Sequence, residues 1–330
     1  MKVLVLLGGE SEERDVSLAS GAQVANGLRE AGHTVLSLDP ARGLLNLSEE
    51  EELLKGAIPR APLLEIPNSK PSTHLLEHQD SLNDADIVFP VLHGGIGENG
   101  TVQAILDLLK VPYVGSDLLG CALAMNKDVT KRLLRAANIL TPDWVLASTP
   151  EEIMETLTFP LICKPVSGGS SVGINLVTNK ESLEEILGSA SEKNPLLMSE
   201  TFVSGRELTV GIVGKETLPV GEIISKHEIF DYECKYRPEM ADEIFPAELD
   251  EETADKVSKK ALQVHELLNL RDFSRIDFIL DEQGMPWVLE ANTLPGMTAN
   301  SLLPKAAKAA GFSFQEFCEK LLFIAKKRNG

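Results

Sequence analysis

Basic side chains are scarce in this chain of 330 residues, and they do not gather into a long run. Lys and Arg number 31 against 50 Asp and Glu, which gives a formal net charge of −19. Binding a nucleic-acid backbone requires a basic stripe that releases counterions. No such cluster occurs outside the short C-terminal run Lys326-Lys327-Arg328. The composition therefore excludes a nucleic-acid partner, and the acidic excess is typical of a cytoplasmic enzyme that its charge keeps soluble.

Long apolar runs and paired cysteines are also missing. No run approaches the roughly 18 apolar residues of a membrane span. The first run, Val3–Leu7, is too short for a secretory signal and predicts a buried strand. The cysteines, Cys121, Cys163, Cys234 and Cys318, show no CxxC spacing and no histidine at ligand spacing. We expect free thiols in a reducing compartment rather than disulfides or a zinc site.

Apolar residues make up 43% of the chain, enough to bury a large core, and at roughly 150 residues per domain the length predicts two or three domains. In the first third, strands expected at 3–7, 34–38 and 86–92 alternate with a helix at 16–31. This order implies an α/β domain with a parallel sheet, whose ligands bind at the carboxyl ends of the strands. The stretch 41–84 is polar and irregular apart from a helix start in Ser48–Glu52.

Strands dominate the rest of the chain. One helix is expected after an Asn126 cap, with apolar positions at helical spacing, and another over 251–268 with a core stripe on one side. Strands are expected at 161–165, 174–177, 196–202, 208–213 and 218–224. The change of pattern near residue 115 and the turn after residue 202 predict domains over 1–115, 116–202 and 203–330.

A glycine- and serine-rich segment, Lys164–Gly173, joins two of these strands. Its glycines, Gly168, Gly169 and Gly173, permit positive φ and turn N–H groups toward an anion, while Ser170 and Ser171 add hydroxyl donors. The order GxxxxGK[ST] is absent and no helix follows, so this is not a Walker A loop. The pattern favours a hairpin that folds over phosphates with Lys164 on its first strand. A flexible turn without a ligand is the alternative.

A dinucleotide site of the Rossmann type is disfavoured at the first strand. The turn Gly8-Gly9 lacks the GxGxxG order, although Asp39 ends the second strand where a ribose-binding acid would lie.

The segment 275–292 predicts a β-hairpin around the turn Asp281–Gly284. Side chains alternate along a strand, so Arg275 and Asp277 share one face and Glu290 and Asn292 share one face. If the two faces coincide, three hard oxygen donors converge beside an arginine, a set that suits Mg²⁺ shared with substrate phosphates. Otherwise these side chains merely face water. The next residues, Thr293–Thr298, offer backbone N–H groups for an anion.

Six segments in a fixed order give the chain a resemblance to the D-alanine–D-alanine ligase family of ATP-grasp enzymes. The resemblance covers nearly the whole length and implies a three-domain ATP-grasp architecture, in which two α+β domains after the α/β domain clasp ATP. The six segments are Gly8–Ser17, His93–Gly100, Met125–Lys127, Lys164–Gly173, Phe230–Tyr236 and Leu289–Thr298.

The resemblance implies that ATP and two Mg²⁺ or Mn²⁺ ions lie between the central and C-terminal domains. Residues 200–203 would meet the adenine, Glu207 the ribose, and lysines the phosphates. The ATP-binding residues implied are Lys127, Lys164, Ser171, Glu200, Thr201, Phe202, Val203, Glu207 and Lys235, and the metal ligands are Asp277, Glu290 and Asn292.

It also implies the chemistry: D-alanine is activated as an acyl phosphate and then attacked by a second D-alanine, for peptidoglycan synthesis. Glu13 would bind the first ammonium, and Arg275 with the Gly296 N–H would stabilise the oxyanion. Ser170 and Tyr236 would join Glu13 in a hydrogen-bond network near the second amine. Tyr236 would belong to a mobile lid over 227–243. Substrate contacts are implied for His93, Ser301 and Leu302, the last two at a helix start that favours a carboxylate.

The chain departs from the family pattern at a few positions. Phe230 stands where many relatives have Tyr, Asn99 and Asn126 replace the commoner Asp, and Cys234 replaces a small residue. Tyr236 is present, and the resemblance implies that its presence favours an amine as nucleophile.

Several alternatives stay open. One is a ligase of another carboxylate–amine pair, and another is a non-catalytic nucleotide sensor, which would not need Arg275. A dehydrogenase is disfavoured by the missing GxGxxG. A homodimer is expected by resemblance only.

Overall fold

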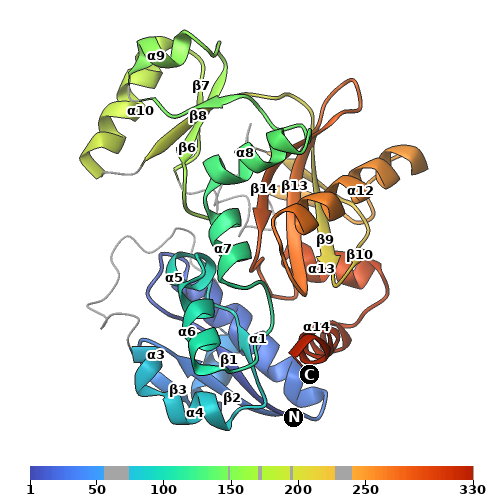
Figure 1. The fold of residues 1–330 in the computed structure, drawn as a ribbon. Coiled ribbons are helices and arrows are strands. Elements are labelled where there is room, and N and C mark those ends of the chain that lie inside the picture. Colours follow the sequence, from blue (N-terminus) through green and yellow to red (C-terminus); the bar gives the residue numbers. More distant parts are fainter. Residues whose placement is uncertain (56–73, 148, 170–172, 194–195, 227–239, 330) are drawn as a thin grey trace.

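Three β-sheets with helices packed on them make up the computed structural model, which describes residues 1–55, 74–147, 149–169, 173–193, 196–226 and 240–329 (Figure 1). The first sheet has the order β3-β2-β1-β4, and β1 pairs in parallel with both β2 and β4, as the sequence predicts. Its strands are β1 (Lys2–Leu6), β2 (Thr34–Asp39), β3 (Gly43–Leu45) and β4 (Ile87–Pro90).

Helices surround this sheet. The helix expected at 16–31 is α1, and the run Ser48–Glu52 lies in the helix α2, as predicted. The elements β3, α3 and α4, however, fall in the stretch 41–84, which the sequence pattern predicts to be irregular. Leu75 and Leu82 are fully buried in those short helices, so two apolar anchors suffice to order a segment that looks polar. The helices are α1 (Arg14–Glu30), α2 (Leu47–Lys55), α3 (His74–Glu77), α4 (Gln79–Asp84), α5 (Gly95–Glu98) and α6 (Thr101–Leu109).

The second sheet is small and antiparallel, with the order β5-β8-β6-β7. Its core joins Leu161, Cys163 and Val177 to Ile153 and Leu183 from two helices. The elements are β5 (Trp144–Val145), α9 (Pro150–Met154), β6 (Leu161–Pro165), β7 (Asn175–Val177), α10 (Lys180–Lys193) and β8 (Leu197–Thr201).

The third sheet is antiparallel, with the order β12-β11-β9-β13-β14 and β10 paired with β9. The single strand expected at 218–224 is wrong at its start, because the ladder resumes only at Gly221, beyond Pro219, which has no N–H to donate. The strands are β9 (Arg206–Val213), β10 (Glu216–Thr217), β11 (Gly221–Ser225), β12 (Ala241–Ile244), β13 (Phe273–Leu280) and β14 (Pro286–Asn292). Helix α12 (Glu251–Leu267) buries its predicted stripe, Val257, Ala261 and Val264, on this sheet.

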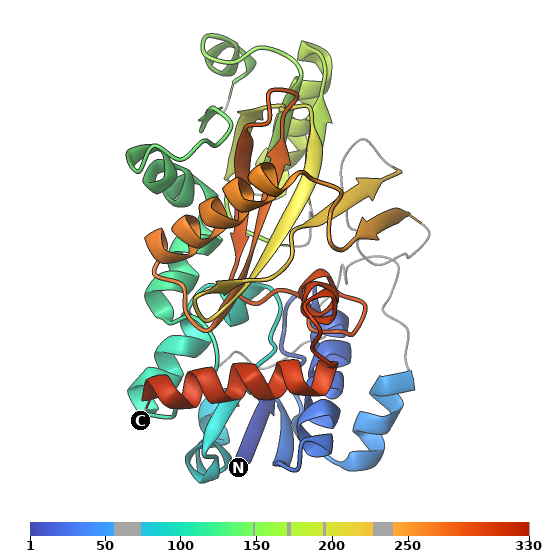
Figure 2. The same ribbon diagram turned by 90° about the vertical axis from the view of Figure 1, so that its right-hand side faces the viewer.

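Packing crosses the predicted domain boundaries. Leu134, from a helix in the 116–202 segment, joins the core of the third sheet, whereas Phe317 and Leu321 join Val24 and Leu28 in the core of the first sheet. Figure 2 shows the last helix lying along the N-terminal domain. The division at 115 and 202 stays a prediction. The helices concerned are α7 (Leu118–Met125), α8 (Lys127–Ala136), α13 (Leu302–Ala309) and α14 (Phe314–Asn329).

The expectations about membrane spans and cysteines can be examined in the described part of the chain. None of its helices is long and apolar enough to cross a membrane. Cys121, Cys163 and Cys318 are buried free thiols, as expected, and Cys234 lies outside the described residues.

Candidate active site

A pocket of about 540 Å³ lies between the second and third sheets. One wall comes from β6, β8 and the residues after β8, and the other from β9, β11, β13 and β14. Apolar side chains such as Ile162, Ile174 and Phe202 form much of the lining. The predicted site residues that line it are Lys164, Glu200, Thr201, Phe202, Val203, Glu207, Asp277, Glu290 and Leu302. A largely apolar lining with several charged side chains suits a ligand that combines an apolar ring with polar groups.

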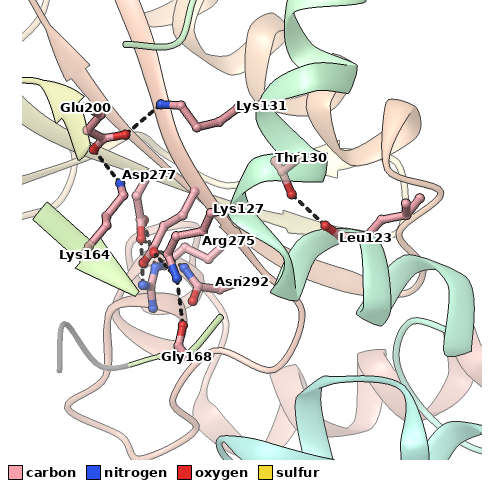
Figure 3. Close-up of polar contacts among 11 residues, drawn as sticks. Leu123, Lys127, Thr130, Lys131, Lys164, Gly168, Glu200, Arg275, Asp277 and Asn292 are labelled. Atoms are coloured by element: carbon pink, nitrogen blue, oxygen red, sulfur yellow. Dashed lines mark hydrogen bonds and ion pairs between the residues drawn. The ribbon is translucent and has the colours of Figure 1, made fainter. Parts of the chain in front are cut away.

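Glu200, which lines this pocket, forms ion pairs with two lysines. The Nζ of Lys164 lies 2.5 Å from Oε1 of Glu200, and the Nζ of Lys131 lies 2.7 Å from Oε2 (Figure 3). Burial raises the pKa of the Glu200 carboxyl, but the two ammonium groups more than offset this and hold it below its ordinary value. Burial lowers the pKa of Lys131 to about 8, against the opposing effect of Glu200.

Sequence reasoning missed Lys131, which is 0% exposed. A signal was available: Lys127 and Lys131 are four residues apart in α8, and they share its buried face with Thr130 and Leu134. Two lysines on the buried face of a helix require acidic or phosphate partners.

The hairpin β13–β14 brings its polar residues onto one face. Arg275 pairs directly with Asn292, and Asp277 with Glu290, so the two faces coincide. The register changes by one residue after Asp277, and Leu289 is the extra residue. Without this bulge Asp277 would stand opposite Leu289 instead of Glu290. The bulge therefore creates the polar cluster, a placement common beside active sites.

Asp277 accepts four hydrogen bonds at the centre of this cluster. Arg275 donates from Nε to Oδ1 at 2.9 Å and from Nη2 to Oδ2 at 2.8 Å. Thr209 donates from Oγ1 to Oδ1 at 2.7 Å. Asn292 donates from Nδ2 to Oδ2 at 3.0 Å (Figure 3). The carboxylate is thus fixed in place, 6% exposed, beside a buried guanidinium.

Lys127 connects the hairpin to the glycine-rich loop. Its Nζ donates to the Gly168 carbonyl at 2.8 Å and lies 4.0 Å from Oε2 of Glu290. Asn126, the predicted cap, accepts the Val129 N–H and starts the helix that positions this lysine. Gly168 has a φ of +132°, as the loop's glycine content predicts.

Gly169 does not have a positive φ. Its lack of a side chain instead lets the Glu13 carboxylate lie close to the backbone. A Cβ on Gly169 would lie 2.9 Å from Oε2 of Glu13 and 3.6 Å from Oε2 of Glu98, and one on Gly94 would lie 2.8 Å from Oε2 of Glu13. The Glu13 carboxylate is therefore held between two glycines. Gly169 thus lies against a second polar cluster, formed by residues that precede residue 115.

That second cluster contains Glu13, Glu98 and His93. Burial, and after it the charge of Glu13, raises the pKa of Glu98 to about 8, while the Gly94 N–H donates to its Oε2 at 3.0 Å. Burial lowers the pKa of His93, which is consequently neutral. Arg275 acts on the pKa of both groups, so this cluster lies next to the polar face of the hairpin.

His93 anchors the loop that follows β14. Its Nδ1 lies 3.0 Å from the Leu294 carbonyl oxygen, which can only accept, so Nδ1 carries the proton. Its Nε2 then accepts from Oγ of Ser20 at 3.2 Å, and Ser20 accepts the Met297 N–H at 3.4 Å. His93 therefore positions the loop that carries Gly296.

Gly296 and Ser301 lie together at the end of this loop. A Cβ on Gly296 would lie 2.7 Å from Oγ of Ser301, which also accepts the Thr298 N–H at 3.2 Å. Helix α13 begins at Leu302, directly after Ser301, as the sequence predicts.

Asp39 is fully committed to internal contacts. It pairs with Arg14, and it accepts the N–H groups of Gly9 at 3.2 Å and Ala41 at 2.9 Å, at 0% exposure. A ribose hydroxyl has no access to it, which removes the structural basis of the dehydrogenase alternative.

Four predicted site residues, Ser170, Ser171, Lys235 and Tyr236, lie outside the described residues, as do Phe230 and most of the predicted lid. At the end of the lid, however, residues 241–243 belong to β12 and pair with β11.

Two antiparallel sheets on either side of a pocket, with a lysine–glutamate pair on one and a carboxylate hairpin on the other, define the ATP-grasp class of enzymes. Family models described as D-ala D-ala ligase N-terminus and D-ala D-ala ligase C-terminus match residues 2–116 and 133–323. The chain belongs to the D-alanine–D-alanine ligase family.

Individual relatives match this chain over nearly their whole length. The D-alanine–D-alanine ligase of Aquifex aeolicus is 41% identical, over 96% of this chain and 98% of the relative. The crystal structure of the Bacillus anthracis D-alanine–D-alanine ligase complexed with ATP has a TM-score of 0.79 at 28% identity, and covers 100% of both chains. That of the VanG D-Ala:D-Ser ligase from Enterococcus faecalis has a TM-score of 0.80 at 29% identity, over 98% of this chain and 99% of the other.

Proposed function

We propose that this protein joins two molecules of D-alanine into D-alanyl-D-alanine with conversion of ATP to ADP and phosphate, a cytoplasmic step of peptidoglycan precursor synthesis. One observation carries the proposal. Arg275, Asp277, Glu290 and Asn292 share one face of a hairpin that borders a 540 Å³ pocket, and the Glu13 carboxylate lies against Gly169 of the glycine-rich loop.

The reaction has to overcome the poor leaving group of a carboxylate. The carboxylate oxygen of the first D-alanine attacks the γ-phosphorus of ATP, and ADP leaves, which gives an acyl phosphate. The amine of the second D-alanine then attacks the carbonyl carbon, loses a proton, and expels phosphate through a tetrahedral oxyanion. The protein's task is to position ATP and two amino acids, each of which carries an anionic group, and to stabilise the charge that develops on their oxygens.

The nucleotide half of the site would hold ATP between the second and third sheets. Lys127 and Lys164 would contact the phosphates, residues 200–203 the adenine, and Glu207 the ribose, with Ser171 and Lys235 added from outside the described residues. The proposal is supported by the apolar residues that line the pocket and by Lys164 in the same lining.

The donor set of the hairpin fits a divalent ion. Asp277, Glu290 and Asn292 supply hard oxygens, the ligands that Mg²⁺ and Mn²⁺ prefer. These three residues, Glu290 included, would hold two ions, and the ions would neutralise negative charge during phosphoryl transfer.

The amino-acid half of the site would use the N-terminal domain and the loop after β14. Glu13 would bind the first ammonium, with Ser170 and Tyr236 beside it near the second amine. Arg275 and the Gly296 N–H would stabilise the oxyanion, and Ser301 with the Leu302 N–H would hold the second carboxylate. His93 would support this arrangement through its hydrogen bond to Leu294.

Phosphate release from ATP tests the function directly. Purified protein with Mg²⁺ should release phosphate when D-alanine is added and form D-alanyl-D-alanine. The likeness to a D-Ala:D-Ser ligase makes D-serine the matched competitor, with D-lactate and the L-amino acids beside it. Release only with a D-alanine and D-serine mixture would overturn the second substrate, and no release with any pair would leave a nucleotide-binding protein.

A homodimer belongs to the same proposal by resemblance. Light scattering after size-exclusion chromatography would measure it, with the 35.8 kDa mass of one chain as the reference.

A further inference from the structure

Lys131 carries a charge in a place where water cannot reach it. It is 0% exposed, its Nζ lies 2.7 Å from Oε2 of Glu200, and the ring of Trp144 lies 5.2 Å from the same nitrogen. It is not among the residues that line the pocket, whereas Glu200 and Lys164 are. Burying an ammonium group is costly unless it is paired, so Lys131 is held by Glu200 rather than by a ligand.

The two lysines on Glu200 therefore differ in what they can do. Lys164 borders the pocket and can turn to an anion there, which would leave Oε1 of Glu200 without its partner. Lys131 has no such freedom, because it lies behind the carboxylate on the buried face of α8. When a polyphosphate draws Lys164 away, Lys131 is the cation that stays with Glu200.

We propose that Lys131 is a positioning residue for base recognition, which keeps Glu200 ionised and its Oε1 an acceptor facing the pocket after Lys164 has moved to the phosphates. The inference rests on the proposed function, because it takes ATP as the ligand of this pocket. The apolar side chains Ile162, Ile174 and Phe202 provide the flat slot in which a base would lie.

An obligatory acceptor distinguishes purines by the group at their 6-position. The 6-amino group of adenine can donate to Oε1, whereas the 6-oxo group of hypoxanthine would place an acceptor against an acceptor. Sites that leave a buried polar group unpaired reject a ligand strongly. Without Lys131 a buried Glu200 would bind a proton, act as a donor, and lose this preference.

The test compares Lys131→Met with wild type through ATP and ITP binding, read from tryptophan fluorescence because Trp144 lies beside Lys131. We expect ATP affinity to fall about tenfold and the ATP-to-ITP preference to fall by a similar factor. In turnover, the KM for ATP should rise while kcat and the KM for D-alanine stay within about twofold. Arg132→Met, which removes a 67% exposed cation from the same helix, is the matched control and should change none of these.

The same substitution in a Glu200→Gln variant separates an effect on base recognition from an effect on folding. The Glu200→Gln variant has no carboxylate charge for Lys131 to stabilise. Adding Lys131→Met to this variant should therefore change ATP affinity by less than about twofold. An equal loss in both backgrounds, or a wild-type ATP-to-ITP preference in Lys131→Met, overturns the inference. Because binding is measured without D-alanine, a failure of the ligation reaction would not be confused with a failure of this role.

Discussion

Gly169→Ala should weaken the first amino-acid site and leave the fold intact. A Cβ at this position would lie 2.9 Å from Oε2 of Glu13 and 3.7 Å from its Cδ. The φ of Gly169 is not in the left-handed region, so the backbone accepts alanine without strain. The change therefore acts on one carboxylate of the proposed site.

The magnitude follows from the contact distance. Ordinary contacts of a Cβ begin at 3.4 Å, so the Glu13 carboxylate must retreat by about 0.5 Å. A misplacement of about 1 Å can cost about 100-fold in rate, so we expect kcat/KM for D-alanine to fall by about tenfold. The KM for ATP should stay within about twofold, and the free energy of unfolding should change by less than about 1 kcal/mol.

The assay is ADP release with D-alanine varied at saturating ATP. Gly188→Ala in α10 is the control for glycine replacement, because nothing lies within 4 Å of its added Cβ. Gly168→Ala is the control for the loop itself, since it strains the backbone at φ +132° but meets no atom within 4 Å. A wild-type KM for D-alanine in Gly169→Ala would refute the placement of Glu13 beneath the loop.

Three further outcomes are expected. Asp277→Asn should abolish most turnover and cost about 3 to 5 kcal/mol in a denaturant titration, since it removes the carboxylate charge to which the buried Arg275 donates two hydrogen bonds; retained turnover would contradict the metal role. The folded-state pKa of Glu98 is about 8 against an ordinary 4.5, so the unfolded chain releases this proton first and the free energy of unfolding falls as pH rises between those values. Glu98→Gln should flatten that fall, and an unchanged slope would contradict the assignment. Arg328→Met should lower the melting temperature through a loss of about 1 to 3 kcal/mol, because Asp272 accepts from Arg328 at 2.8 and 3.1 Å and is nearly inaccessible to water; an unchanged melting temperature would show that the pair contributes nothing.

The hairpin marks the limit of what a sequence pattern can establish. Alternation alone predicts that Arg275 shares a face with Asp277, and it predicts the same for Glu290 and Asn292. Whether the two faces coincide depends on the register, and the register depends on a one-residue bulge at Leu289. A bulge has no apolar signature of its own, so a difference of one residue decided between a polar cluster and an ordinary solvent face.

Helix partners were equally out of reach of the pattern. The apolar stripe of α14 predicts burial but not the surface that it covers, and Phe317 packs into the core of the first sheet although it lies more than 200 residues along the chain from that sheet. Lys131 was overlooked because a lysine in an amphipathic helix is usually solvated. Its burial is explained by an acidic partner on a different sheet, Glu200, which spacing within α8 cannot reveal.

Charge balance in the pocket connects these observations to the acidic composition. The chain carries a net charge of −19, yet buried cations lie in and beside its pocket, and each is paired with a carboxylate: Lys131 and Lys164 with Glu200, and Arg275 with Asp277. When phosphate oxygens draw a cation away, the carboxylate that it leaves loses a positive partner. Glu200 would keep Lys131, whereas Asp277 would gain a divalent ion in the proposed metal site. The polyphosphate would thus offer oxygens to the divalent ion, and the ion would supply positive charge beside Asp277. Their binding should be mutually reinforcing, which is how an acidic protein can bind an anion without a basic surface.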